Sequence, residues 1–190
     1  MKNIERVMDI LEKYYHANRR TTLNRMRKKP NPFRILISCL ISLRTKDENT
    51  ERISRELFKV ADTPEKISKM NVRKLEKILY SSGYFRNKSK TVKHVSKVIL
   101  EKYHGKVPDT EEELLSIKGV GRKTANIVLN FAFNKLVIPV DVNVHRVANR
   151  LGWIKTKNAD ETEMELMKIV PKKYWRELNA IFVLHGKKIC

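Results

Sequence analysis

Two glycines and a lysine lie close together in the segment 114–126, which reads LLSIKGVGRKTAN. Gly119 and Gly121 predict a tight hairpin between two helices, because glycine adopts positive φ and lets another backbone approach closely. Val120 is expected to point inward and anchor the turn. The amides after the two glycines are expected to lack internal partners, and free amides at a helix start bind anions such as phosphate. An ordinary helix–helix corner is the alternative.

Lys123 is the residue of this segment with the most reactive chemistry. It is predicted to lie in the first turn of the second helix, where the helix dipole and Arg122 both disfavour its protonated form. An unprotonated lysine amine is a nucleophile suited to Schiff-base formation. Most lysines in a chain this rich in lysine are solvated surface groups, and spacing alone leaves that interpretation of Lys123 open.

Asp141 is the second candidate for chemistry. It follows the apolar segment LVIPV and precedes NVHRVANR, which is predicted to be a helix over about 143–151. A carboxylate in this position caps the helix or takes part in a reaction, and the two roles are compatible.

The charge of the chain narrows the class of partner. The 190 residues include 41 Lys plus Arg and 21 Asp plus Glu, a formal net charge of +20. Such a surface favours nucleic acid first and an anionic membrane second. The longest apolar run, Ile35 to Leu43, is far shorter than the roughly 20 residues of a membrane span, so we expect no membrane partner. The N-terminus reads as an amphipathic helix and not a signal peptide, so a cytoplasmic, nucleoid-associated location is expected.

The elements that position these residues are predicted to be helices throughout. Apolar residues recur at helical spacing along the chain, and only 12 residues are Gly or Pro, which argues against a turn-rich all-β fold. We expect about ten or eleven short helices, joined by a polar connection at 18–31. Asp47 and Thr110 are predicted N-caps, the latter in a capping box with Glu113. Further helices are predicted over 88–103 and 172–185.

The hairpin and the aspartate together resemble one known family. GVGRKTANIVLN, followed by PVDVNVHRVANRLG with Asp141 eighteen residues after Lys123, is similar to the endonuclease III branch of the helix-hairpin-helix DNA glycosylases. The segments ILISCLISLRTKDENT, LYSSGYFRNKSK and VLHGKKIC are also similar to family segments, so the resemblance covers nearly the whole chain.

The resemblance implies an all-α fold of two helical lobes with a DNA-binding cleft between them. One lobe is a six-helix barrel over residues 25–135, with the helix-hairpin-helix at about 110–133. The other combines residues 1–24 with 136–190. The implied partner is double-stranded damaged DNA, bound by a monomer.

The resemblance also implies a bifunctional enzyme, with Lys123 as nucleophile and Asp141 as its partner. Such enzymes remove a damaged base, usually an oxidised pyrimidine, after flipping the nucleotide out of the duplex, and then cleave the abasic site by β-elimination. No step needs a metal. Relatives that only remove mismatched bases usually lack the lysine. The alternative from another class is a non-catalytic helix-hairpin-helix DNA-binding module, which has no use for Lys123 and Asp141 together.

Several positions depart from the family pattern or extend it. Lys118 stands where the hairpin usually has Pro, and Arg44 where many relatives have a Gln that fills the space of the flipped base. Tyr84 matches an apolar wedge, although packing for Tyr84 and a solvated charge for Arg44 remain open alternatives. Asp47 resembles a family site residue. Further residues expected to contact DNA are Arg122, Lys88, His145 and Arg146.

The two cysteines bear on a cofactor that the family normally carries. Cys39 lies in an apolar run and is expected to be a buried thiol. Cys190 matches the first of four cysteines in the family's iron–sulfur loop. Two cysteines cannot complete a four-thiolate site, so no cofactor is expected in the chain as given, and a [4Fe–4S] cluster requires three more cysteines from a longer C-terminus.

Overall fold

The structure is a computed structural model that describes residues 3–15, 26 and 29–190. All regular secondary structure within these residues is helical, which confirms the all-α prediction. The α-helices are α1 (Ile4–Tyr15), α3 (Pro32–Ser42), α4 (Asp47–Val60), α5 (Pro64–Lys69), α6 (Val72–Leu79), α7 (Phe85–Lys102), α8 (Glu111–Ser116), α9 (Arg122–Ala132), α10 (Val142–Arg150), α11 (Ala159–Ile169) and α12 (Trp175–Lys188), and a 3-10 helix covers Lys172–Tyr174.

Local sequence explains where several helices begin. Pro32 occupies the first turn of α3, where its missing N–H costs nothing, and the Asn31 side chain accepts from the Arg34 amide at 2.9 Å. Thr110 caps α8 by accepting from the Glu113 amide, and its hydroxyl donates to the Glu113 carboxylate at 2.6 Å. The predicted cap at Thr110 is therefore confirmed.

Other local predictions need correction. Asp47 is the first residue of α4 and does not cap it, since Lys46 holds the N-cap position without a side-chain hydrogen bond. Helix α7 begins at Phe85, three residues earlier than predicted, because Tyr84 takes the N-cap in a left-handed conformation. The single helix predicted over 172–185 is a 3-10 turn followed by α12. The predicted connection at 18–31 lies mostly outside the described residues.

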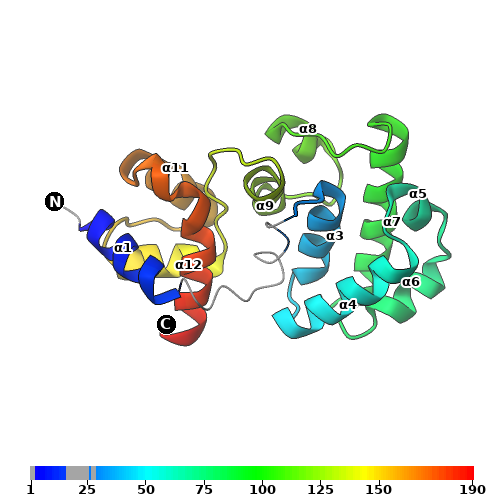
Figure 1. Ribbon diagram of the computed structural model, residues 1–190, viewed down its shortest axis with the longest axis horizontal. Coiled ribbons are helices and arrows are strands. Elements are labelled where there is room, and N and C mark those ends of the chain that lie inside the picture. Colours follow the sequence, from blue (N-terminus) through cyan, green and yellow to red (C-terminus); the bar gives the residue numbers. More distant parts are fainter. Residues whose placement is uncertain (1–2, 16–25, 27–28) are drawn as a thin grey trace.

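The helices gather into two lobes, each with its own hydrophobic core (Figure 1). The larger lobe contains α3 to α9, and its core is centred on α3, most of whose residues are buried. The second lobe combines α1 with α10 to α12, and its largest fully buried side chains include Tyr15 and Phe182. Helix α9 belongs to the core of the larger lobe, and the segment 134–141 leads from its end to α10. The N- and C-terminal helices thus pack together in one lobe, in agreement with the predicted all-α fold of two lobes.

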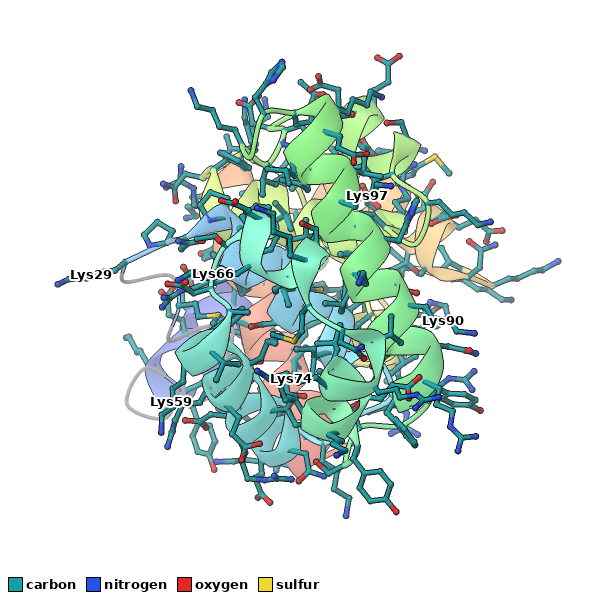
Figure 2. All side chains as sticks on the ribbon, turned by 90° about the vertical axis from the view of Figure 1, so that its right-hand side faces the viewer. Lys29, Lys59, Lys66, Lys74, Lys90 and Lys97 are labelled. Carbon is teal, nitrogen blue, oxygen red and sulfur yellow. The ribbon has the colours of Figure 1, made fainter. Side chains whose placement is uncertain are left out.

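Positive charge is spread widely over the larger lobe. Figure 2 looks onto the end of this lobe that faces away from the second lobe, and the labelled lysines extend outward from α4 to α7 and from the segment before α3. Lys66 and Lys97 form exposed i,i+4 ion pairs with Asp62 and Glu101. Net charge alone therefore does not locate a site. None of the described helices is long and apolar enough to cross a membrane.

Candidate active site

The hairpin between α8 and α9 depends on Gly119. Its φ of 99° lies in the region that side chains rarely adopt, and a Cβ at this position would lie 2.6 Å from Thr91 Cγ2 on α7. Val120 is buried in the core of the larger lobe, which confirms the predicted inward anchor. The Val120 amide donates to the Ile117 carbonyl at 2.9 Å, so the prediction that the amide after Gly119 lacks an internal partner is wrong.

Gly121 differs from Gly119 in conformation and surroundings. Its φ is −92° and its ψ 170°, an extended conformation open to any residue, so the predicted need for positive φ is wrong here. A Cβ on Gly121 would meet nothing within 4 Å. Gly121 is also the N-cap of α9 and offers no side chain to cap it, which leaves the first turn of this helix accessible from outside.

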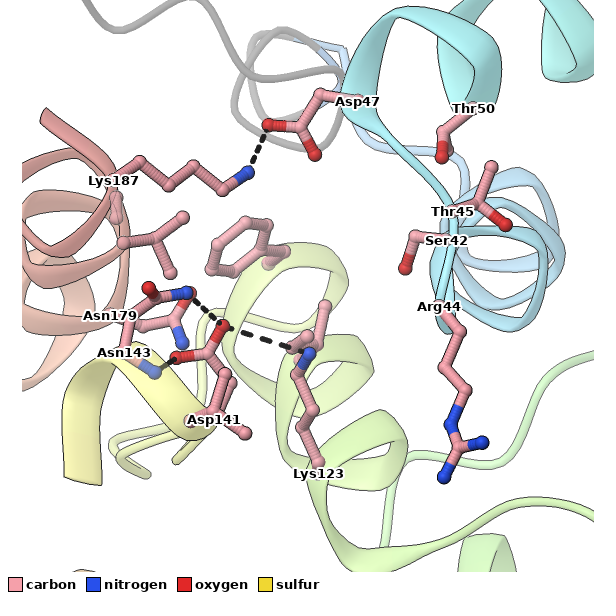
Figure 3. A pocket seen from close by; sticks show the side chains of 15 residues that line it. Ser42, Arg44, Thr45, Asp47, Thr50, Lys123, Asp141, Asn143, Asn179 and Lys187 are labelled. Atoms are coloured by element: carbon pink, nitrogen blue, oxygen red, sulfur yellow. Dashed lines mark hydrogen bonds and ion pairs between the residues drawn. The ribbon is translucent and has the colours of Figure 1, made fainter. Parts of the chain in front are cut away.

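Lys123 and Asp141 lie opposite each other, as Figure 3 shows. Lys123 Nζ is 3.8 Å from Asp141 Oδ2, and the Lys123 side chain is 36% exposed against 11% for Asp141. Asp141 caps α10, with Oδ1 accepting from the amides of Asn143 and Val144 at 2.9 Å each, so the predicted cap is confirmed. Asp141 Oδ2 accepts from the Asn143 side-chain amide at 3.2 Å. The cap thus fixes one carboxylate oxygen and aims the other at the lysine.

A cavity of about 250 Å³ adjoins this pair. Its walls come from the α3–α4 turn, α9, the start of α10 and α12, so both lobes contribute. The Asp47 carboxylate of α4 and the Lys187 ammonium of α12 form an ion pair on the far side of the cavity from Lys123 (Figure 3). No local sequence signal points to Lys187, because its partner Asp47 lies 140 positions away in the chain.

Arg122 forms ion pairs within the protein, which disfavours the predicted phosphate contact. Its Nε lies 3.0 Å from Glu163 Oε2 on α11, and its Nη1 lies 3.3 Å from Glu111 Oε1 on α8. Asp160 adds a third carboxylate at 4.0 Å. The hydrogen bond to Glu163 raises the pKa of Arg122. Three carboxylates therefore offset the charge of Arg122.

Arg44 and Tyr84, which the sequence suggested separately, form a contacting pair. The guanidinium carbon of Arg44 lies 5.3 Å from the centre of the Tyr84 ring, and Arg44 Nη1 donates to the Tyr84 hydroxyl at 3.0 Å. Both residues have positive φ, 52° and 58°. Tyr84 is 63% exposed, so the packing alternative fails for this ring. The pair projects a flat, charged group from the larger lobe.

Lys88 lies inside the larger lobe, which contradicts the predicted phosphate contact. The residue is 8% exposed, and its Nζ donates to the Ile41 carbonyl at 2.9 Å and to the Thr45 hydroxyl at 2.5 Å. Burial lowers the pKa of Lys88 from its ordinary value to about 8. Its ammonium is therefore committed to protein acceptors.

His145 and Arg146 are also held by internal partners, and their predicted position along the DNA backbone stays a prediction. His145 Nδ1 lies 2.7 Å from the Thr162 hydroxyl of α11. Arg146 Nη2 donates to the Asn143 side chain and to the Gly186 carbonyl of α12, both at 2.8 Å. These contacts hold α10 against α11 and α12.

The residues present do not fit an iron–sulfur cluster. Cys39 is fully buried in the core of the larger lobe, as predicted, and burial raises the pKa of its thiol. Cys190 is exposed. Within the described residues, no group of three or more His, Cys, Asp or Glu side chains could hold a metal ion.

Comparison with known proteins identifies the class to which this fold and site belong. Residues 37–172 match the family model described as HhH-GPD superfamily base excision DNA repair protein, and the chain belongs to this superfamily. The endonuclease III of Thermotoga maritima is 46% identical over 166 residues, which cover 87% of this chain and 78% of that protein. The endonuclease III of Buchnera aphidicola subsp. Schizaphis graminum is 38% identical over 99% of this chain and 89% of its own length.

A solved structure gives the same result. A trapped covalent endonuclease III–DNA intermediate matches with a TM-score of 0.87 at 31% identity, covering 98% of this chain and 86% of that one. Within the superfamily the chain belongs to the endonuclease III family. It is a DNA-binding enzyme of base excision repair, a DNA glycosylase and abasic-site lyase.

Proposed function

We propose that the protein removes oxidised pyrimidines from double-stranded DNA and cleaves the resulting abasic site through a Schiff base on Lys123. The observation that carries this proposal is the meeting of Lys123 and Asp141 at 3.8 Å beside a cavity formed by both lobes. A non-catalytic DNA-binding module would need neither the amine nor the aligned carboxylate.

The first step replaces the damaged base by the lysine. The nucleotide is flipped into the cavity, because the sugar carbon C1′ cannot be reached inside the stack. Asp141 Oδ2 accepts a proton from the Lys123 ammonium, and the freed lone pair of Nζ forms a bond to C1′ while the bond from C1′ to the base breaks. The base leaves with the bonding electrons and takes up a proton. Once Asp141 has passed its proton on to the leaving base, the restored carboxylate stabilises the positive charge on the sugar.

The second step breaks the strand. The C1′–O4′ bond of the sugar ring then breaks, O4′ takes up a proton that Nζ gives up, and the resulting protonated imine between Nζ and C1′ draws electrons from C2′. Loss of a C2′ proton then drives electrons toward C3′, and the bond from C3′ to the phosphate oxygen breaks in a β-elimination. Water finally hydrolyses the imine and releases Lys123 as a free amine.

Two surfaces beside the cavity support binding of the duplex. The first turn of α9 at Gly121 is uncapped and unobstructed, which suits a phosphate. The exposed Arg44–Tyr84 pair suits insertion into the base stack next to the flipped nucleotide. If phosphate contacts dominate, the logarithm of the affinity falls linearly with the logarithm of salt concentration.

Borohydride trapping tests the proposal directly. The protein is incubated with duplexes that carry an abasic site, an oxidised thymine or no lesion, and the imine is reduced to a stable covalent adduct. We expect an adduct with the first two duplexes, none with Lys123→Gln, and a normal adduct with Lys118→Gln, a matched change in the same hairpin. Absence of an adduct with the unaltered protein, or its persistence in Lys123→Gln, would falsify the mechanism.

The assembly and location of the protein complete the proposal. We propose that one monomer engages each lesion, that residues 25–135 form the lobe bearing the hairpin, and that residues 1–24 and 136–190 form the other. Light scattering of the free protein and of its DNA complex tests the first point. We propose a cytoplasmic, nucleoid-associated location, which imaging of a fluorescent fusion tests.

A further inference from the structure

The turns that carry Arg44 and Tyr84 pack directly against each other. We call residues 41–45 and 81–85 the paired turns. A Cβ on Gly83 would lie 2.6 Å from the Arg44 carbonyl oxygen, so the two backbones touch because position 83 is glycine. Both Arg44 and Tyr84 have positive φ, a conformation that is strained at a residue other than glycine and persists only where the surroundings enforce it. Some internal group must therefore hold the paired turns.

Lys88 is placed to do this. Its buried ammonium joins the last turn of α3, at the Ile41 carbonyl, to the Thr45 hydroxyl directly after Arg44. A cation near the end of a helix satisfies carbonyls that lack intrahelical partners and opposes the helix dipole. Both hydrogen bonds run from α7 to the turn at residues 41–45, and α7 begins directly after Tyr84. Lys88 thus connects both sides of the paired turns.

The same helix also contacts the hairpin. Thr91 follows Lys88 by three residues, which places the two on one face of α7, and the Thr91 methyl group packs where Gly119 has no side chain. A cavity of about 400 Å³ runs between these contacts and is lined by residues of the paired turns, by Lys88 and Thr91, and by Gly119. One face of α7 therefore sets the spacing between the paired turns and the hairpin.

We propose that Lys88 is a positioning residue for base extrusion: it ties the end of α3 and Thr45 to α7 and so holds Arg44 against Tyr84 at a set distance from the hairpin. The inference rests on the proposed function, in which Arg44 and Tyr84 enter the base stack. Lys88 touches no reacting atom, so its effect depends on whether the base must still be extruded.

Single-turnover base release from two substrates tests this role. One is a duplex with a paired oxidised thymine, and the other carries the same lesion in a bubble of mismatched pairs, where extrusion costs little. Lys88→Met keeps the length of the side chain and removes its donors. We expect base release to slow by about tenfold on the duplex, the loss that accompanies a charge-assisted hydrogen bond, and by no more than about twofold on the bubble. Lys90→Met, on the exposed face of α7, is the matched control and should behave as the unaltered protein.

A spectroscopic signal separates extrusion from chemistry. In a Lys123→Gln background, 2-aminopurine opposite the lesion should brighten as its stack opens, and adding Lys88→Met should remove most of that increase. Thr45→Val, which deletes only the hydroxyl acceptor, should slow duplex turnover in the same direction and serves if Lys88→Met does not fold. Equal slowing on both substrates, or none on either, overturns the role of Lys88. Failure of the unaltered protein to release base from the bubble overturns the proposed function instead.

Discussion

The hairpin and the paired turns both place left-handed backbone beside the 400 Å³ cavity, but they do so with different residues. In the hairpin the position is Gly119, which adopts a φ of 99° without steric cost. In the paired turns the positions are Arg44 and Tyr84, whose side chains oppose that conformation. The hairpin takes its shape from a glycine of its own, whereas the paired turns also depend on Lys88 of helix α7. The hairpin can be predicted from a local sequence motif, whereas the paired turns form only when the larger lobe packs.

Replacing Lys123 should have the largest effect, because the hairpin supplies the bond-forming atom. Lys123→Gln should reduce the rate of base release by on the order of 10³ to 10⁶, as loss of a covalent nucleophile does in other enzymes. Affinity for lesion DNA, measured by fluorescence anisotropy, should change little. A residual rate within tenfold of the unaltered protein would mean that the hairpin only binds DNA.

Asp141→Asn separates the two roles of the carboxylate. Asn caps helices about as well as Asp, so the free energy of unfolding should stay within about 0.5 kcal/mol. Asn does not accept the proton of Lys123, so base release should slow by roughly 10²-fold or more. Denaturant unfolding and single-turnover kinetics give the two quantities. A large loss of stability with normal kinetics would show that Asp141 acts only as a helix cap.

Replacement by alanine should affect a different property at each hairpin glycine, namely stability at Gly119 and DNA affinity at Gly121. Gly119→Ala forces a positive φ on alanine and a clash with Thr91, so it should lower the free energy of unfolding by about 1–3 kcal/mol. Gly121→Ala fits the extended backbone and should cost less than about 1 kcal/mol. Its methyl group enters the space proposed for a phosphate, so DNA affinity should fall. Equal affinities for Gly121→Ala and the unaltered protein would show that no phosphate binds at Gly121.

The last effect concerns pH and the paired turns. Burial lowers the pKa of Lys88 to about 8, below the roughly 10.4 of an unfolded chain. Between these values the unfolded chain binds more protons, so the free energy of unfolding should rise with pH from about 8 to about 10.4. Lys88→Met should lack this rise. The measurement is denaturant unfolding of both proteins across that range, and parallel curves would show that the Lys88 site is better hydrated than its burial implies.

Sequence reasoning reached features that depend on neighbouring residues and missed those that depend on the folded lobe. The cap at Thr110, the inward Val120 and the cap at Asp141 follow from short-range spacing, and all three are present. The burial of Lys88 could not be foreseen, because its acceptors lie 43 and 47 residues away.

Charge pairing was hidden for the same reason. Arg122 reads as a phosphate contact beside a hairpin of a basic protein, yet Glu163, 41 residues later, binds it. In a chain with a twofold excess of basic residues, the few acidic groups decide which cations remain available, and their positions depend on how the two lobes meet.

The carboxylates around Arg122 have a mechanical consequence. Glu111 belongs to the larger lobe and Glu163 to the second, so Arg122 joins the lobes at the residue next to Lys123. The Asp47–Lys187 ion pair joins the same two lobes on the far side of the cavity. The cavity therefore lies between two ion-pair contacts that cross from one lobe to the other, and their attraction, which salt screens, helps to keep Lys123 within reach of Asp141.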